Sequence, residues 1–144
     1  MIEERVALVL DNDQYHFLPG ERLSGRFWLA PEAVGKEIKR IEVSVGWRTE
    51  GKGDEDAGVH HSEDLAPDFR PIDPIEEHRF ETRLPLSPLS YDGHLVKIHW
   101  RVLVQVHFRG REHWTGEAPF WLGDVRWPPQ EKVQPLEQDD LASP

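Results

Sequence analysis

The sequence contains no cysteine. That absence excludes disulfide bonds, thiolate nucleophiles, iron–sulfur clusters and cysteine-ligated zinc. The sequence also lacks a glycine-rich phosphate loop that leads into a helix, and none of its serines lies in a nucleophile-elbow pattern. Paired carboxylates occur mainly in one acidic segment, which is expected to be a loop. A loop would not hold the two carboxylates in a fixed catalytic geometry. We therefore expect a protein that is not an enzyme and that needs no cofactor.

An excess of basic residues is also missing. The 144 residues include 17 Lys and Arg against 27 Asp and Glu, which gives a net charge of −10. This balance argues against a nucleic-acid-binding protein and against general attraction to anionic membranes. The charge is uneven, because residues 50–79 and 123–144 carry the negative excess and the remainder is neutral. A neutral body can still carry a local basic patch that the total conceals.

Long hydrophobic runs are absent as well. No apolar stretch approaches the roughly 20 residues that a membrane-spanning helix needs. The N-terminal residues show no basic stretch followed by an apolar one, which is the pattern of a secretory signal. The sequence thus predicts a cytoplasmic protein without integral membrane association.

Apolar and polar residues alternate with a period of two over much of the chain. The pattern runs through Arg22–Ala30 and Ile41–Trp47, and it is longest in Val96–Phe108, where Leu103 is the one apolar exception on the polar stripe. Alternation of this kind indicates strands with one face in a core and one in water. Turn residues separate the runs, and Arg109–Arg111 predicts a tight hairpin that brings His107 near His113. The fold class predicted is all-β, an immunoglobulin-like antiparallel β-sandwich of about seven or eight strands with little or no helix.

Two segments do not fit the sandwich. Residues 50–77 are acidic and contain glycine and proline, which predicts a long loop of a length that is usually functional or disordered. Residues 127–144 form a polar, proline-bearing C-terminal tail that begins at Trp127. The predicted domain organisation is a sandwich over residues 1–126, which includes the acidic loop 50–77, followed by the tail.

Three stretches, in this order and spacing, resemble the arrestin superfamily. The first is Tyr15–Gly25, in which a Pro-Gly-Glu turn leads into a strand with a spaced glycine. The second is Ile38–Gly51, an alternating strand that ends in a glycine-containing loop. The third is Phe80–Gly93, in which Leu-Pro and Ser-Tyr-x-Gly turns feed the long strand that follows.

The resemblance implies an arrestin-like β-sandwich of the N-terminal, single-lobe type found in bacteria, with an adaptor or scaffold function. Most arrestin-like proteins have two lobes, whereas this sequence has room for one. Pairing of two copies as a homodimer would rebuild the two-lobed arrangement. The basic residues with which arrestins sense phosphate have no match here, so phosphate sensing is not implied. The expected partner is another protein of unknown identity.

Candidate residues for partner binding are few. Trp28 lies on the polar side of its strand beside Arg26, where it either anchors a partner or is covered by a loop or the tail. The partner surface is expected to be a sheet edge, this outward patch or the acidic segment. The candidate partner-binding residues are Trp28, Arg26, Asp54, Glu55, Asp56 and Trp127.

Metal binding is not predicted. His60 and His61 with Glu63 have the side chains that zinc or nickel prefer. Adjacent histidines seldom both bind one ion without a third partner, and a solvated polar loop explains the same residues.

Two functions remain open at this stage. The first is an arrestin-like protein-interaction module, for which self-association is one way to pair lobes. The alternative is a β-sandwich that binds a small ligand or carbohydrate on exposed tryptophans. A solvent-facing row formed by Trp28, Trp114 and Trp121 would favour the alternative, whereas buried rings would favour the interaction module.

Overall fold

The computed structural model describes residues 5–53, 55–65 and 76–123. In these residues the chain is nearly all strand, with two short 3-10 helices between strands, as the sequence predicts. The strands are β1 (Val6–Leu10), β2 (His16–Phe17), β3 (Arg22–Leu29), β4 (Ile38–Gly51), β5 (Ala57–Asp64), β6 (His78–Arg83), β7 (Tyr91–Asp92), β8 (Val96–Phe108) and β9 (His113–Leu122). The 3-10 helices are η1 (Asp11–Asp13) and η2 (Pro31–Ala33).

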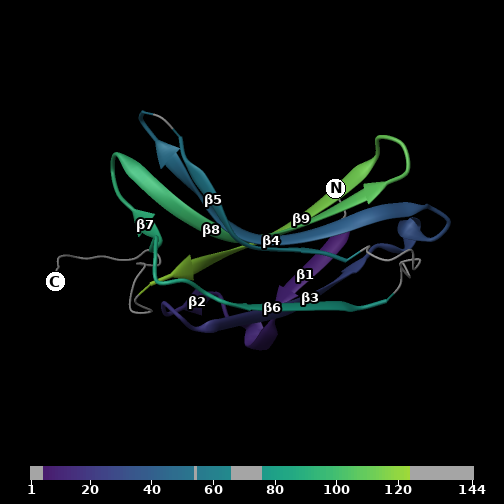
Figure 1. Ribbon diagram of the computed structural model, residues 1–144, viewed down its shortest axis with the longest axis horizontal. Coiled ribbons are helices and arrows are strands. Elements are labelled where there is room, and N and C mark those ends of the chain that lie inside the picture. The colour runs from purple at the N-terminus through teal and green to yellow at the C-terminus, as the bar shows by residue number, and fades with distance from the viewer. Residues whose placement is uncertain (1–4, 54, 66–75, 124–144) are drawn as a thin grey trace.

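The strands form two sheets that pack face to face (Figure 1). The small sheet has the order β1-β3-β6, and the large sheet has the order β2-β9-β8-β4-β5, with β7 added to the start of β8. The predicted antiparallel pairing holds except for β2, which pairs with β9 in parallel over two residues. Figure 1 shows that the large sheet is strongly bent, so that its outer face is concave.

The core lies between the two sheets. Alternate residues of the two longest strands, such as Val43 on β4 and Val104 on β8, are completely buried, as the alternation predicts. The small sheet contributes Phe27 and Phe80, whose rings lie with centroids 6.5 Å apart. Burial of these apolar faces removes them from water, which stabilises the sandwich.

The prediction of an acidic loop over residues 50–77 is wrong for residues 57–64, because these residues form strand β5. The strand pairs antiparallel with β4, and a β-bulge at Val45 and Gly46 leaves His60 without a partner residue. Because β5 lies at the edge of the sheet, none of its side chains is fully buried and its sequence shows no core stripe. Residues 66–75 and the predicted tail lie outside the described residues.

Gly25 on β3 lies very close to Phe80 on β6 and to the backbone of Val9 on β1. A Cβ atom at this position would come within 2.6 Å of Phe80 Cζ and 2.7 Å of the Val9 carbonyl oxygen. The side of β3 that Gly25 faces therefore has no room for a side chain, and glycine is suited to such a close approach.

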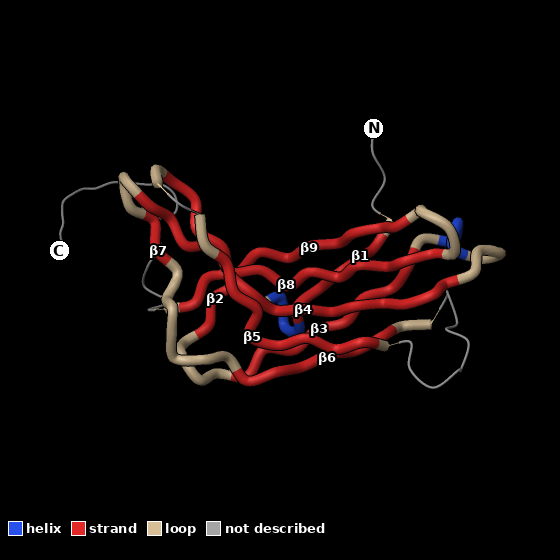
Figure 2. Tube along the Cα trace, turned by 45° about the horizontal axis from the view of Figure 1, so that its top comes forward, coloured by secondary structure: helices blue, strands red, loops and turns tan. Residues whose placement is uncertain are grey.

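Figure 2 shows the strands of both layers running along the long axis of the molecule. The β6–β7 loop, β7 and the β7–β8 turn lie together at one end in both views. Among the described residues, no helix is long and apolar enough to cross a membrane.

Candidate interaction surface

Trp28 and Arg26 lie together on the outer face of the small sheet, as predicted. The Arg26 guanidinium is 5.9 Å from the centroid of the Trp28 ring, and its Nε lies 3.2 Å from Glu77 Oε2. Trp28 is 37% exposed, at the lower end of the exposed side chains. The guanidinium covers part of the ring and offers a cation–π contact in place of a free apolar surface.

The other tryptophans of the described part of the chain do not join Trp28 in a row. Trp100 and Trp114 are buried, and Trp47 and Trp121 are half-buried. The solvent-facing row that a carbohydrate-binding surface requires is therefore not formed by the described residues.

The acidic candidates lie at the turn between β4 and β5, where Glu55 is exposed. Asp56 closes this turn: its N–H donates to Thr49 Oγ1 at 2.8 Å, and its carbonyl oxygen accepts the N–H of Thr49 at 2.8 Å. These backbone contacts give Asp56 a structural role in the turn. Asp54 and Trp127 lie outside the described residues, and their roles stay predictions.

The three candidate metal ligands do not converge on one point, because His60 contacts the other sheet while His61 and Glu63 contact each other. His60 Nε2 lies 2.7 Å from the Arg83 carbonyl oxygen and links the edges of the two sheets, whereas His61 Nε2 lies 2.7 Å from Glu63 Oε2. Across residues 5–53, 55–65 and 76–123, no three histidine, aspartate or glutamate side chains are grouped as a metal site would need.

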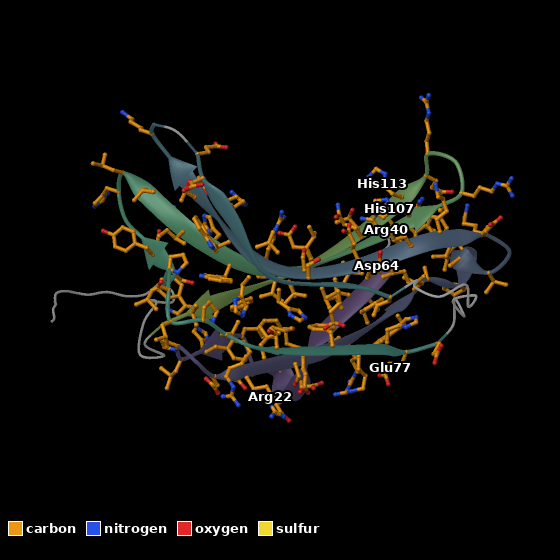
Figure 3. The ribbon with its side chains drawn as sticks, in the orientation of Figure 1. Arg22, Arg40, Asp64, Glu77, His107 and His113 are labelled. Atoms are coloured by element: carbon orange, nitrogen blue, oxygen red, sulfur yellow. The ribbon has the colours of Figure 1, made fainter. Side chains whose placement is uncertain are left out.

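A row of charged side chains crosses the concave outer face of the large sheet (Figure 3). Arg40 Nη2 lies 2.6 Å from Glu42 Oε2, and Arg40 Nε lies 3.5 Å from Asp64 Oδ2. The ring centroids of His107 and His113 are 6.3 Å apart, so the hairpin brings these two histidines together as predicted. Opposite charges alternate along the row, which leaves no strong field of one sign at this place.

Glu50 and His99 form a second pair on the same face. Glu50 Oε1 lies 2.7 Å from His99 Nε2, and this hydrogen bond, aided by the charge of His99, lowers the pKa of Glu50 below its ordinary value of 4.5. Favourable contacts to the ionised form of an acid contribute to stability above its ordinary pKa, and they are lost as the pH falls through the lowered folded-state pKa.

Replacing His99 with alanine is expected to raise the pKa of Glu50 back toward 4.5. A carboxyl-detected NMR titration of the wild type and of His99→Ala measures this shift directly. His107→Ala is a matched control, because His107 lies on the same strand near Glu42 rather than Glu50. A titration of Glu50 that is the same in the wild type and in His99→Ala would contradict the assignment.

Exposed apolar side chains gather at one end of the molecule. Of the nine large hydrophobic side chains that are exposed in the described residues, six come from the β2–β3 turn, the β6–β7 loop, β7, the β7–β8 turn and the first residue of β8. We call this surface the apolar end. Its residues are Leu18, Leu86, Leu89, Tyr91, Leu95 and Val96.

Contacts with the core fix the loop that carries part of the apolar end. Trp100 Nε1 donates to the Pro88 carbonyl oxygen at 2.7 Å, and the Leu122 N–H donates to Ser90 Oγ at 2.8 Å. These bonds hold the polar groups of the loop toward the sandwich, while Leu86 remains 75% exposed and Leu89 46% exposed. Large apolar side chains held outward in this way are typical of a protein-binding surface.

The sequence carries a signal for the apolar end that hydrophobic alternation does not capture. Leu86, Leu89 and Leu95 are apolar residues within turn segments, where polar residues are the rule. Only Leu18 is brought to this end by the fold, because the β2–β3 turn is far from residues 86–96 in sequence.

No protein-family model and no curated protein sequence matches the chain. Among solved structures, the chain is similar to Spo0M, the sporulation control protein from Bacillus subtilis. The TM-score is 0.58 with 21% identity, and the match covers 85% of this chain and 51% of that one. A superoxide reductase (neelaredoxin) from Ignicoccus hospitalis aligns with a TM-score of 0.44 and 9% identity, over 81% of this chain and 80% of that chain. The latter likeness is too low to support an argument.

The fold of Spo0M is arrestin-like, so the structural comparison supports an arrestin-like fold for this chain. At 21% identity the likeness concerns the fold alone. The chain spans about half the length of the Spo0M structure that it matches.

Proposed function

We propose that the chain is a non-enzymatic interaction module that binds a second β-sandwich lobe through its apolar end. The gathering of six exposed large hydrophobic side chains at that end carries the proposal. Large exposed apolar patches are rare on monomeric proteins, and where they occur they commonly mark protein–protein contacts. The likeness to a sporulation control protein is consistent with a regulatory function that needs no chemistry.

The sheet edges are less suited to the same task. The edge strand β5 carries Glu63 and Asp64 and is interrupted by a β-bulge. The edge strand β6 carries Arg79, Glu81 and Arg83. Charges and bulges on edge strands oppose the addition of a further strand, so these edges are protected against pairing.

The partner lobe that we propose is a second copy of this chain. The arrestin resemblance implies a two-lobed arrangement, and the matched part of Spo0M is about half of that protein. A contact between two copies would be isologous, so each apolar end would meet the same surface of its partner. The carbohydrate-binding alternative has no comparable support, because Trp28 is the one exposed tryptophan among the described residues and is partly covered by Arg26.

Sedimentation velocity of the chain over a range of concentrations tests the proposal. The wild type is expected to associate reversibly to a dimer. The double variant Leu86→Glu/Leu95→Glu is expected to weaken that association by at least about 30-fold, because each dimer would bury four unpaired carboxylates among apolar side chains.

Val34→Glu is the matched control, because Val34 is 59% exposed but follows η2 and is not part of the apolar end. This variant is expected to associate like the wild type, and thermal melting checks that all variants stay folded. A wild type that stays monomeric at every concentration would overturn the self-association. Equal weakening by Val34→Glu would show that the apolar end is not its site.

A further inference from the structure

A second feature of the concave outer face is a hollow between β4, β5 and β8, with a volume of about 360 Å³. This volume falls within the range of sites that hold a side chain or a small ligand. The residues that line it are Ser44, Gly46, Trp47, Arg48, Ala57, Gly58, Val59, Arg101 and Leu103.

The hollow lies beside the β-bulge, where β4 and β5 approach each other closely. Gly46 faces outward on β4, and β5 runs so close to it that a Cβ atom would lie 2.5 Å from the Gly58 carbonyl oxygen. The hollow next to this close approach has apolar surroundings: Val59 is 69% exposed, and Leu103 is the apolar exception on the polar stripe of β8. The hollow therefore offers an apolar floor on an otherwise polar face.

Two arginines lie at this apolar floor. Arg101 is paired with Gly46 across the strands and Arg48 with His99, so the two arginines are diagonal neighbours on the same face of the sheet. From diagonal positions on neighbouring strands, side chains as long as arginine can come close to each other. A ligand in the hollow can therefore contact both guanidinium groups.

The two arginines have unused hydrogen-bonding capacity. Arg101 Nη1 lies 3.2 Å from Glu117 Oε1, which leaves most of its five N–H donors available. Among the residues that the structure describes, the side chain of Arg48 forms neither a hydrogen bond nor an ion pair within salt-bridge distance. The hollow thus offers guanidinium donors on a chain with a net charge of −10.

We infer that the hollow binds a peptide segment in which a carboxylate side chain stands next to an apolar one. The apolar side chain would pack against Leu103 and Val59, and the carboxylate would accept charge-assisted hydrogen bonds from Arg48 and Arg101. Charge complementarity favours a single carboxylate over a phosphate dianion, because the carboxylates of Glu50 and Glu117 lie close by and repel additional negative charge.

This site is separate from the apolar end, so the two proposals succeed or fail independently. The apolar end is formed by turns at one end of the sandwich, whereas the hollow lies on the outer face of the large sheet. An acidic segment of a partner protein could therefore bind while the apolar end is occupied.

Titration of the isotope-labelled full chain with the capped peptide acetyl-Leu-Glu-Val-Glu-Leu-amide tests the inference by amide chemical shifts. We expect the largest shifts in residues 44–48, 57–59 and 101–103. The glutamine version of the peptide removes the charge, the version with serine in place of Leu and Val removes the apolar groups, and inorganic phosphate tests a simple anion. Each of these three probes is expected to bind at least about tenfold more weakly.

Arg48→Met keeps the aliphatic stem and removes the guanidinium, and is expected to weaken binding of the acidic peptide by about tenfold or more. Arg22→Met is the matched control, because Arg22 is an exposed arginine on β3 in the small sheet that contacts Glu81. Binding that is equal for the glutamine version, or unchanged by Arg48→Met, would overturn the inference. So would shifts confined to the free edge of β5, which would indicate strand addition without side-chain recognition, and so would the absence of binding at millimolar peptide.

Discussion

Replacing Trp100 with alanine is expected to lower the free energy of unfolding by about 3–5 kcal/mol. The ring is only 1% exposed and packs against Phe120, with 5.8 Å between ring centroids. Removing so large a side chain leaves a cavity where the start of β8 meets β9, and it also removes the hydrogen bond to Pro88. Urea unfolding followed by circular dichroism measures the loss.

Trp100→Phe separates the packing of the ring from its hydrogen bond. Phenylalanine keeps most of the apolar volume but cannot donate to the Pro88 carbonyl oxygen, and we expect a loss of about 1–3 kcal/mol. Trp121→Phe is the matched control, because Trp121 Nε1 has no hydrogen-bond partner in the described residues. Equal losses from the two substitutions would contradict a stabilising role for the bond to Pro88.

The same bond links stability to the apolar end, because Pro88 lies between Leu86 and Leu89 in the loop. Trp100→Phe is therefore expected to weaken self-association as well as stability, although it changes no residue of the apolar end. Trp121→Phe is expected to leave self-association unchanged.

Gly25→Ala is expected to cost about 1–3 kcal/mol, although it adds a single methyl group. The new Cβ atom would lie 2.6 Å from Phe80 Cζ and 2.7 Å from the Val9 carbonyl oxygen, so β1, β3 and Phe80 must all shift. The urea midpoint should fall with little change in the slope of the transition, since the extent of unfolding stays the same.

A double-mutant cycle identifies the source of that cost. Phe80→Leu shortens the ring that the new methyl group would meet, so the double variant Gly25→Ala/Phe80→Leu should be more stable than the sum of the two single losses predicts. Strictly additive losses would show that the contact with Phe80 does not cause the strain.

Side-chain alternation made the main body of the fold predictable. Every second residue is buried over Ile41–Val45 on β4 and over Trp100–Phe108 on β8, and a period of two of this kind has no other common explanation. The turn residues Arg109–Arg111 predicted the proximity of His107 to His113, which is confirmed.

Strand β5 and the two proposed sites depend on information that the alternation does not contain. An edge strand is stabilised by backbone pairing with one neighbour, so Val59 and His61 give no buried stripe to recognise. The hollow depends on the register at Gly46, where the β-bulge shifts the pairing. The apolar end depends on turn residues that carry no alternation and on Leu18, which only the folded chain brings near residues 86–96.

Hydrogen–deuterium exchange at low and high protein concentration tests the central claim most directly, because it locates the surface that self-association covers. The account predicts that exchange slows at high concentration in peptides that span residues 85–98, and that the edge strand β5 exchanges equally at both concentrations. Slower exchange along β5 or β6, with residues 85–98 unchanged, would contradict the account and would assign self-association to a sheet edge.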